Sequence, residues 1–125
     1  MKDYRTPLSK ARGLGSAKSG VGHFVGQRVS AVALAILIPI FVWAIATLPG
    51  GDYDSARAFV GSPLGALIFV LALSAAFFHM RIGLQVVIED YIHKPATKMV
   101  LLVANTLIAA GLWLAMIYSV LAIAA

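Results

Sequence analysis

One histidine of this sequence lies inside an apolar stretch that is long enough to cross a membrane. The stretch reads FFHMRIGLQVVIEDYIHKP from Phe77 to Pro95 and contains both His79 and Arg81. Ionisable side chains within a bilayer are costly and are usually functional. We therefore interpret His79 as a ligand of a buried redox cofactor.

Helical spacing puts His79, Gly83 and Asp90 along one face. The 11 residues from His79 to Asp90 make about three turns and roughly 16 Å of rise. If Asp90 marks the membrane interface, His79 lies near the middle of the bilayer. Gly83, one turn after His79, lets a flat and bulky group approach the backbone. A haem fits this description, and a histidine bonded to a serine, threonine or carbonyl of another helix is the structural alternative.

The two residues after His79 point elsewhere. Met80 is rotated by about 100° around the helix and cannot reach the same axial position, so we expect it to pack. Arg81 is rotated by about 200°, toward the opposite side. It can snorkel to the interface, pair with an acid of a partner subunit, or reach a haem propionate, and the sequence does not choose among these roles.

Polar residues near the ends of two expected helices suggest further sites. Asp90 and Tyr91 pair a carboxylate with a phenol at the membrane rim, where reduction of a quinone needs a hydrogen-bond donor and a source of protons. His93 could serve the proton path. Arg28 begins the first expected helix, where it could hold a haem propionate or a lipid phosphate.

Composition then defines the elements that must carry these residues. With 61% hydrophobic and 12% charged residues among 125, the chain is an integral membrane protein. The sequence predicts an all-α fold with three transmembrane helices, over about 29–48, 64–88 and 99–123. Cysteine is absent, which excludes thiolate-held iron–sulfur clusters and disulfides, so a metal must be bound by histidine, methionine or oxygen.

The charge pattern predicts one topology. Residues 1–28 are read as a basic cytoplasmic segment and residues 29–125 as the transmembrane anchor domain. The loop around 93–98 is basic again, whereas the loop expected between the first two spans, up to Pro63, carries Asp52, Asp54 and only Arg57. The positive-inside rule places the N-terminus inside and the C-terminus outside. We favour a bacterial inner membrane over a mitochondrial one. The net charge of +5 thus reflects the membrane topology and does not indicate a nucleic-acid site. The basic residues ahead of the first span are Lys2, Arg5, Lys10, Arg12, Lys18 and Arg28.

These motifs resemble the hydrophobic membrane-anchor subunit of succinate dehydrogenase, respiratory complex II. The pattern that carries the resemblance is His79-x-x-x-Gly83 followed by Asp90-Tyr91, together with the run from Gly22-His23-Phe24 to Arg28. The resemblance implies that His79 is an axial ligand of haem b and that Tyr91 hydrogen-bonds ubiquinone, with Asp90 beside it. Some relatives have an aromatic residue where this chain has Arg81, so the resemblance is silent about that residue.

The resemblance also implies partners. A flavoprotein subunit and an iron–sulfur subunit oxidise succinate, while this chain and a second anchor of cytochrome b type hold haem and quinone in the lipid. The chain alone is then no enzyme. His79 is the only histidine expected at depth, so the second axial ligand of a six-coordinate haem comes from another chain.

Two other classes of protein compete with this interpretation. A transport or channel protomer would use His79 and Arg81 as a relay, but the third span offers few polar groups to it. These are Asn105, Thr106, Tyr118 and Ser119. A non-catalytic assembly scaffold would pack through small residues such as Ala109-Ala110-Gly111, and it leaves the alignment of His79 with Asp90 unexplained.

Overall fold

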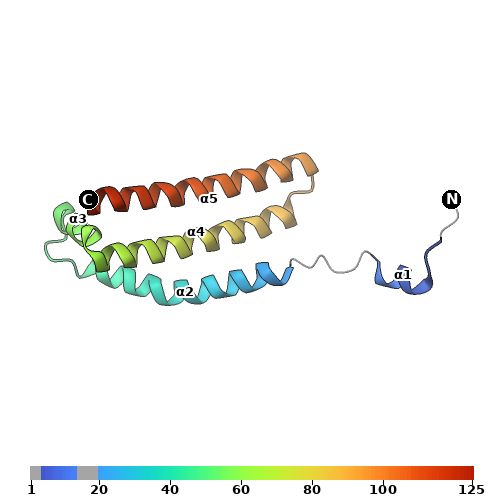
Figure 1. The fold of residues 1–125 in the computed structure, drawn as a ribbon, viewed down its shortest axis with the longest axis horizontal. Coiled ribbons are helices and arrows are strands. Elements are labelled where there is room, and N and C mark those ends of the chain that lie inside the picture. The colour runs from blue at the N-terminus through green and yellow to red at the C-terminus, as the bar shows by residue number, and fades with distance from the viewer. Residues whose placement is uncertain (1–3, 14–19) are drawn as a thin grey trace.

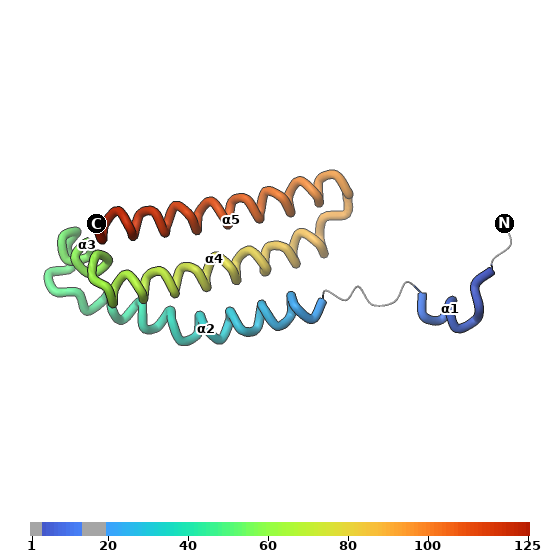
Figure 2. The backbone as a smooth tube through the Cα atoms, viewed as in Figure 1, coloured from blue at the N-terminus to red at the C-terminus, as the bar shows by residue number. Residues whose placement is uncertain are grey.

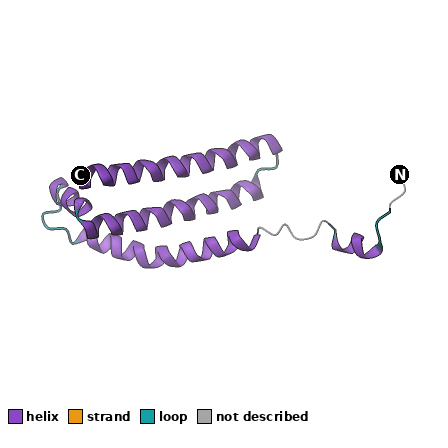
Figure 3. Ribbon diagram, in the orientation of Figure 1, coloured by secondary structure: helices purple, strands orange, loops and turns teal. Residues whose placement is uncertain are grey.

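The protein is described by a computed structural model over residues 4–13 and 20–125. All regular structure in these ranges is helical (Figure 3). The elements in chain order are α1 (Pro7–Arg12), α2 (Gly20–Ala46), α3 (Tyr53–Gly61), α4 (Pro63–Tyr91) and α5 (Pro95–Ala124) (Figure 1). Three of them, α2, α4 and α5, are long and apolar enough to span a membrane, which confirms the predicted all-α fold with three spans.

The three long helices lie side by side in a row with α4 in the middle. α4 packs against α2 on one side and against α5 on the other (Figures 1 and 2). The start of α2 and the α4–α5 turn lie at one end of the row, and α3 and the C-terminus lie at the other. We call these the basic end and the capped end.

The first long helix is longer than the sequence predicts. It begins at Gly20 rather than near Val29, so the polar residues before the apolar run are already helical. Hydropathy marks only the part of a helix that fits the hydrocarbon layer, and the turns that reach into the headgroup region escape it. His23, Gln27 and Arg28 therefore sit on α2. Of the predicted basic segment, residues 1–3 and 14–19 lie outside the described ranges.

The segment between the first two spans contains a helix where we predicted only a loop. α3 begins after Asp52, whose carboxylate accepts a hydrogen bond from the backbone N–H of Ser55 at 2.9 Å. Ser62 ends α3 and also caps α4, because its hydroxyl accepts from the N–H of Gly65 at 3.1 Å. The prediction was wrong because these two caps were not recognised as helix-start signals.

The corner between α3 and α4 is tight and apolar. A Cβ on Gly65 would overlap the carbonyl oxygen of Phe59, so only glycine fits there. Val60 of α3 is buried against Met116 and Val120 of α5, and this cluster is the core of the capped end. The packing fixes the ends of α4 and α5 relative to each other at this side of the molecule.

The seam between α2 and α4 is close at the basic end. A Cβ on Gly26 would come within 3.3 Å of the Ile82 side chain and 3.5 Å of the Phe78 ring. Nearer the capped end, the rings of Phe41 and Phe69 meet edge to face with centroids 5.6 Å apart. The small residue at position 26 lets the two backbones approach just where the polar side chains of the seam lie.

Candidate functional site

His79 lies in the seam between α2 and α4, where its ring is half-buried. Its Nδ1 is 2.9 Å from the hydroxyl oxygen of Ser30, and its Nε2 is 3.3 Å from the amide nitrogen of Gln27. The Ser30 hydroxyl is also within 3.1 Å of the Gln27 carbonyl oxygen. The structural alternative, a cross-helix bond from the histidine to a serine, is thus present, and it engages Nδ1.

The hydrogen bonding at Nε2 of His79 is weaker than that at Nδ1. The side-chain oxygen of Gln27 is buried and has no hydrogen-bond partner among the described residues. Gly83, one turn after His79, faces the same amide: a Cβ added there would meet only the Gln27 nitrogen, at 3.7 Å. We call Gln27, Ser30, His79 and Gly83 the seam cluster.

The seam cluster fits a haem by the chemistry of its groups. A neutral imidazole is a common axial ligand of haem iron, and the nitrogen opposite the Ser30 bond is the one available to a metal. The orphaned oxygen belongs to the Gln27 amide whose nitrogen meets Nε2, and the open space at Gly83 adjoins the same amide. The sequence predicted His79 and Gly83, and the structure brings them together with two residues that it missed.

Gln27 and Ser30 escaped the sequence analysis although a signal existed. They are three residues apart, which puts them on one face of a helix, and they stand at the border of an apolar run. Polar groups buried in a membrane need partners, and Ser30 is only 5% exposed. A search for partners of His79 would have selected them once α2 was extended past Val29.

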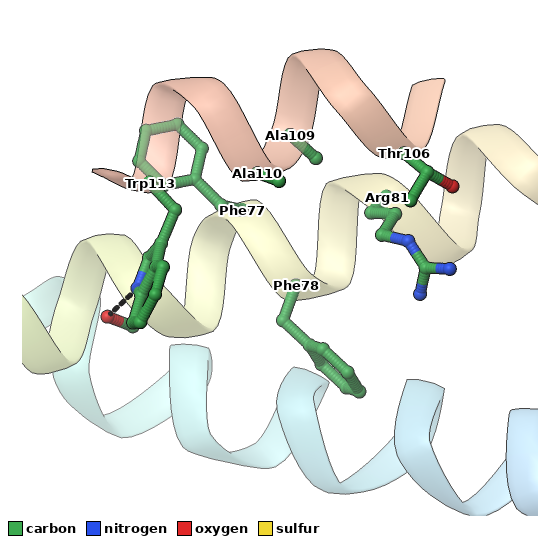
Figure 4. A pocket seen from close by; sticks show the side chains of 8 residues that line it. Phe77, Phe78, Arg81, Thr106, Ala109, Ala110 and Trp113 are labelled. Carbon is green, nitrogen blue, oxygen red and sulfur yellow. Dashed lines mark hydrogen bonds between the residues drawn. The ribbon is translucent and has the colours of Figure 1, made fainter. Parts of the chain in front are cut away.

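Met80 and Arg81 face α5 rather than α2. Met80 lines an apolar groove between α4 and α5, as expected for a packing residue. Arg81 lines a separate cavity of about 390 Å³ between the same helices, whose walls include Trp113. Figure 4 shows Arg81 at the end of the cavity near Thr106 and away from Trp113, with its guanidinium directed away from Thr106. Arg81 is thus on the other side of α4 from the seam cluster.

Polar residues of the third span serve the packing of α5 on α4. The amide of Asn105 donates to the backbone carbonyl of Arg81 at 2.9 Å and is buried. The indole N–H of Trp113 donates to the Ser74 hydroxyl at 2.8 Å (Figure 4). Ala109 is buried in this seam, whereas Gly111 is exposed. Because Asn105 is already bonded to a main-chain group, it is a poor member of an ion relay.

The predicted quinone residues lie where α4 reaches the basic end, apart from the seam cluster. Asp90, Tyr91 and His93 are exposed, with 76% of the Tyr91 surface accessible. Twelve residues of helix separate His79 from Tyr91, about 18 Å along the axis. Next to them, Lys98 donates to the Glu89 carbonyl at 2.7 Å and ties the start of α5 to the end of α4.

Arg28 lies on α2 near the basic end. Its guanidinium carbon is 5.2 Å from the centre of the Phe24 ring, a cation–π distance. With His23 and Gln27 it lines a cavity of about 310 Å³ between α2 and α4, whose other wall includes Ile82. This cavity adjoins the seam cluster, since Gln27 belongs to both.

Three membrane-spanning helices in a row define the chain as a small integral membrane protein, and the seam of α2 and α4 contains a half-buried imidazole. The profile of the succinate dehydrogenase/fumarate reductase transmembrane subunit family matches residues 2–117. The chain belongs to this family, and the resemblance stated from the sequence is confirmed.

Named relatives agree with this membership. The chain is 39% identical over 88 residues to the succinate dehydrogenase hydrophobic membrane anchor subunit of Paracoccus denitrificans, covering 70% of this chain and 68% of that protein. It is 29% identical over 102 residues to the same subunit of Rickettsia bellii, with 82% of each covered, and 28% identical over 103 residues to that of Rickettsia typhi, with 81% and 82% covered. These relatives are anchor subunits, in agreement with the prediction that the chain alone is no enzyme.

Proposed function

We propose that the chain anchors a succinate:ubiquinone oxidoreductase in the membrane, gives one axial ligand to haem b and forms part of the ubiquinone site. The observation that carries the proposal is the state of His79 in the seam cluster. Its Nδ1 is held by Ser30, while its Nε2 meets only an amide whose oxygen has no partner among the described residues. A bound haem would supply one-electron storage between the iron–sulfur subunit and the quinone.

Three residues would hold the haem from this chain. His79 would give Nε2 to iron, and Gly83 would leave space for the macrocycle because it has no side chain. Arg28 would neutralise a propionate from the cavity that it shares with Gln27, because the planar guanidinium can bind a carboxylate through two hydrogen bonds. A lipid phosphate is the competing partner of Arg28.

The second axial ligand would come from another subunit. Of the other two histidines, His23 is in the first turn of α2 and His93 is in the α4–α5 turn, and both are exposed. Neither lies at the depth of His79. A second anchor of cytochrome b type would therefore complete the coordination. The iron–sulfur and flavoprotein subunits bind on the side of the membrane that the basic end faces.

Tyr91 and Asp90 serve the quinone at the end of α4. The Tyr91 phenol donates a hydrogen bond to a quinone carbonyl, and the Asp90 carboxylate orders the neighbouring water. His93 lies two residues further, in the turn, where it passes protons from the aqueous side. The two electrons arrive from the iron–sulfur subunit, and the two protons arrive through these side chains.

The basic end faces the cytoplasm of a bacterium and the capped end faces outward. Arg28, Lys94 and Lys98 lie at the basic end, while Asp52 and Asp54 lie at the capped end. This asymmetry follows the positive-inside rule. It puts the C-terminus outside and the quinone residues on the cytoplasmic rim of the inner membrane. The exposed apolar surface of α2, α4 and α5 then meets lipid and the second anchor.

The haem assignment is tested by the variant His79→Ala in the purified complex. We expect the optical bands of haem b to be lost or shifted, because iron loses an axial nitrogen. Met80→Ala is the matched control, since Met80 is adjacent but faces α5. An unaltered spectrum in His79→Ala would refute ligation by this residue.

The quinone assignment is tested by Tyr91→Phe. Loss of one neutral hydrogen bond costs about 0.5–1.5 kcal/mol, which lowers quinone reduction roughly 2- to 13-fold. Succinate oxidation with a soluble acceptor should stay at the level of the unmodified complex, because that reaction does not involve the anchor. Quinone turnover equal to that of the unmodified complex would count against the role of Tyr91.

A further inference from the structure

We propose that Ser30 positions His79 for iron by accepting a hydrogen bond from the ring Nδ1–H, so that Nε2 keeps its lone pair. The inference rests on the proposed function, because it concerns the haem ligand of that proposal. It makes Ser30 a positioning residue and gives a reason why a serine interrupts the apolar face of α2.

The hydroxyl of Ser30 is held between two groups. It lies 2.9 Å from Nδ1 of His79 and 3.1 Å from the backbone carbonyl oxygen of Gln27, in a residue that is 5% exposed. A serine hydroxyl has one proton to donate and can accept as well. When that proton is given to the Gln27 carbonyl, the oxygen can only accept from the ring, and Nδ1 must carry hydrogen.

This arrangement agrees with the contact on the other side of the ring. With hydrogen on Nδ1, Nε2 bears a lone pair and accepts from the Gln27 amide nitrogen at 3.3 Å. With hydrogen on Nε2 instead, two donors would face each other at that distance. The 3.3 Å hydrogen bond from the Gln27 amide nitrogen to Nε2 is long. The oxygen of the same amide has no partner among the described residues, so iron can displace the Gln27 amide from Nε2.

A bond at Nδ1 does more than orient the ring. A histidine that binds a metal usually donates its other N–H to a fixed acceptor, which sets the tautomer and raises the basicity of the ligand. A more basic imidazole favours ferric over ferrous iron. Removing the acceptor should therefore raise the midpoint potential of the haem. If the relative affinity for the two iron states changes about tenfold, the one-electron potential moves by about 59 mV.

The test compares three substitutions of Ser30 in the purified whole complex. The variants Ser30→Ala and Ser30→Cys remove the acceptor or replace it with a weak sulfur acceptor, and Ser30→Thr keeps the hydroxyl. The measurements are a potentiometric titration of the haem band and the electron paramagnetic resonance spectrum of the low-spin ferric haem. We expect a higher potential and altered g values for Ala and Cys, with Thr near the original values.

Ser74→Ala is the matched control, because Ser74 is another membrane-embedded serine and bonds to Trp113 instead. It should leave both haem measurements unchanged. If the Ser30→Ala complex does not accumulate, the Ser30→Cys complex is measured instead, because the cysteine side chain has nearly the volume of serine. Potential and spectrum equal to those of the unmodified complex in the variant that assembles would overturn the role of Ser30.

The outcome of His79→Ala separates this inference from the proposed function. If His79→Ala loses the haem signal and Ser30→Ala leaves it untouched, only the positioning role fails. If His79→Ala keeps an unaltered haem, the ligand assignment itself fails, and the Ser30 inference fails with it.

Discussion

Substituting Gly83 by alanine separates a haem-packing role from ordinary helix packing. The added methyl group would meet only the Gln27 amide nitrogen, at 3.7 Å, which is a normal van der Waals contact. Alanine in place of glycine within a helix contributes about 0.5–1 kcal/mol of stability. The protein fold should therefore be as stable as before or slightly more so.

If a haem packs on this face, the same substitution should weaken haem binding. An extra methyl group in a filled site costs about 1–3 kcal/mol. At about 1.4 kcal/mol for each factor of ten, haem binding would weaken roughly 5- to 140-fold. The two expectations differ in sign, so a single variant distinguishes them.

The assay measures haem and stability in the same preparation. Haem content is determined relative to flavin in the purified complex, together with the rate of haem loss to an acceptor protein, and thermal unfolding reports the fold. Gly111→Ala is the control, because a Cβ at Gly111 meets no atom within 4 Å. If Gly83→Ala retains haem at the original ratio and rate, the reasoning about this face is refuted.

Three further predictions concern the scaffold. Gly65→Ala should prevent the α3–α4 corner from closing and sharply lower the yield of assembled complex, and a normal yield would contradict the overlap described there. Asn105→Leu removes the hydrogen bond to the Arg81 carbonyl and should lower the free energy of unfolding by about 0.6 kcal/mol, at most about 1.7 kcal/mol. An unfolding titration in detergent measures this, and an unchanged free energy would refute the role of Asn105. The pKa of Asp52 is lowered by hydrogen bonds from Ser55, so the cap it forms on α3 is complete above its usual pKa and is lost as the pH falls through the lowered one. A carbon-13 titration of the carboxyl should show the pKa of Asp52 rising toward its usual value in Ser55→Ala, and an unmoved pKa would count against this cause.

The membrane spans could be predicted because hydropathy reports them directly. The apolar runs indicated α2, α4 and α5, although α2 starts at Gly20 and not at Val29. Periodicity also put His79 and Gly83 on one face, and both face Gln27 in the structure. These are properties of one helix and need no knowledge of its neighbours.

The parts that could not be predicted depend on contacts between helices. The position of Gln27 and Ser30 at the border of an apolar run marks them as candidates, but only the packing of α2 against α4 shows that they meet the two ring nitrogens of His79. The role of Asn105 likewise required knowing which side of α4 faces α5. α3 is a different case, because its capping residue Asp52 was visible but was assigned to a loop.

The row of helices gives α4 two separate packing faces. Because α4 lies between α2 and α5, its contacts with α5 do not involve the surface that carries His79. The α4–α5 seam is held by hydrogen bonds of Trp113 and Asn105, apart from that surface. The haem that we propose at His79 would therefore concern the α2–α4 seam and leave the contacts of α4 with α5 as they are.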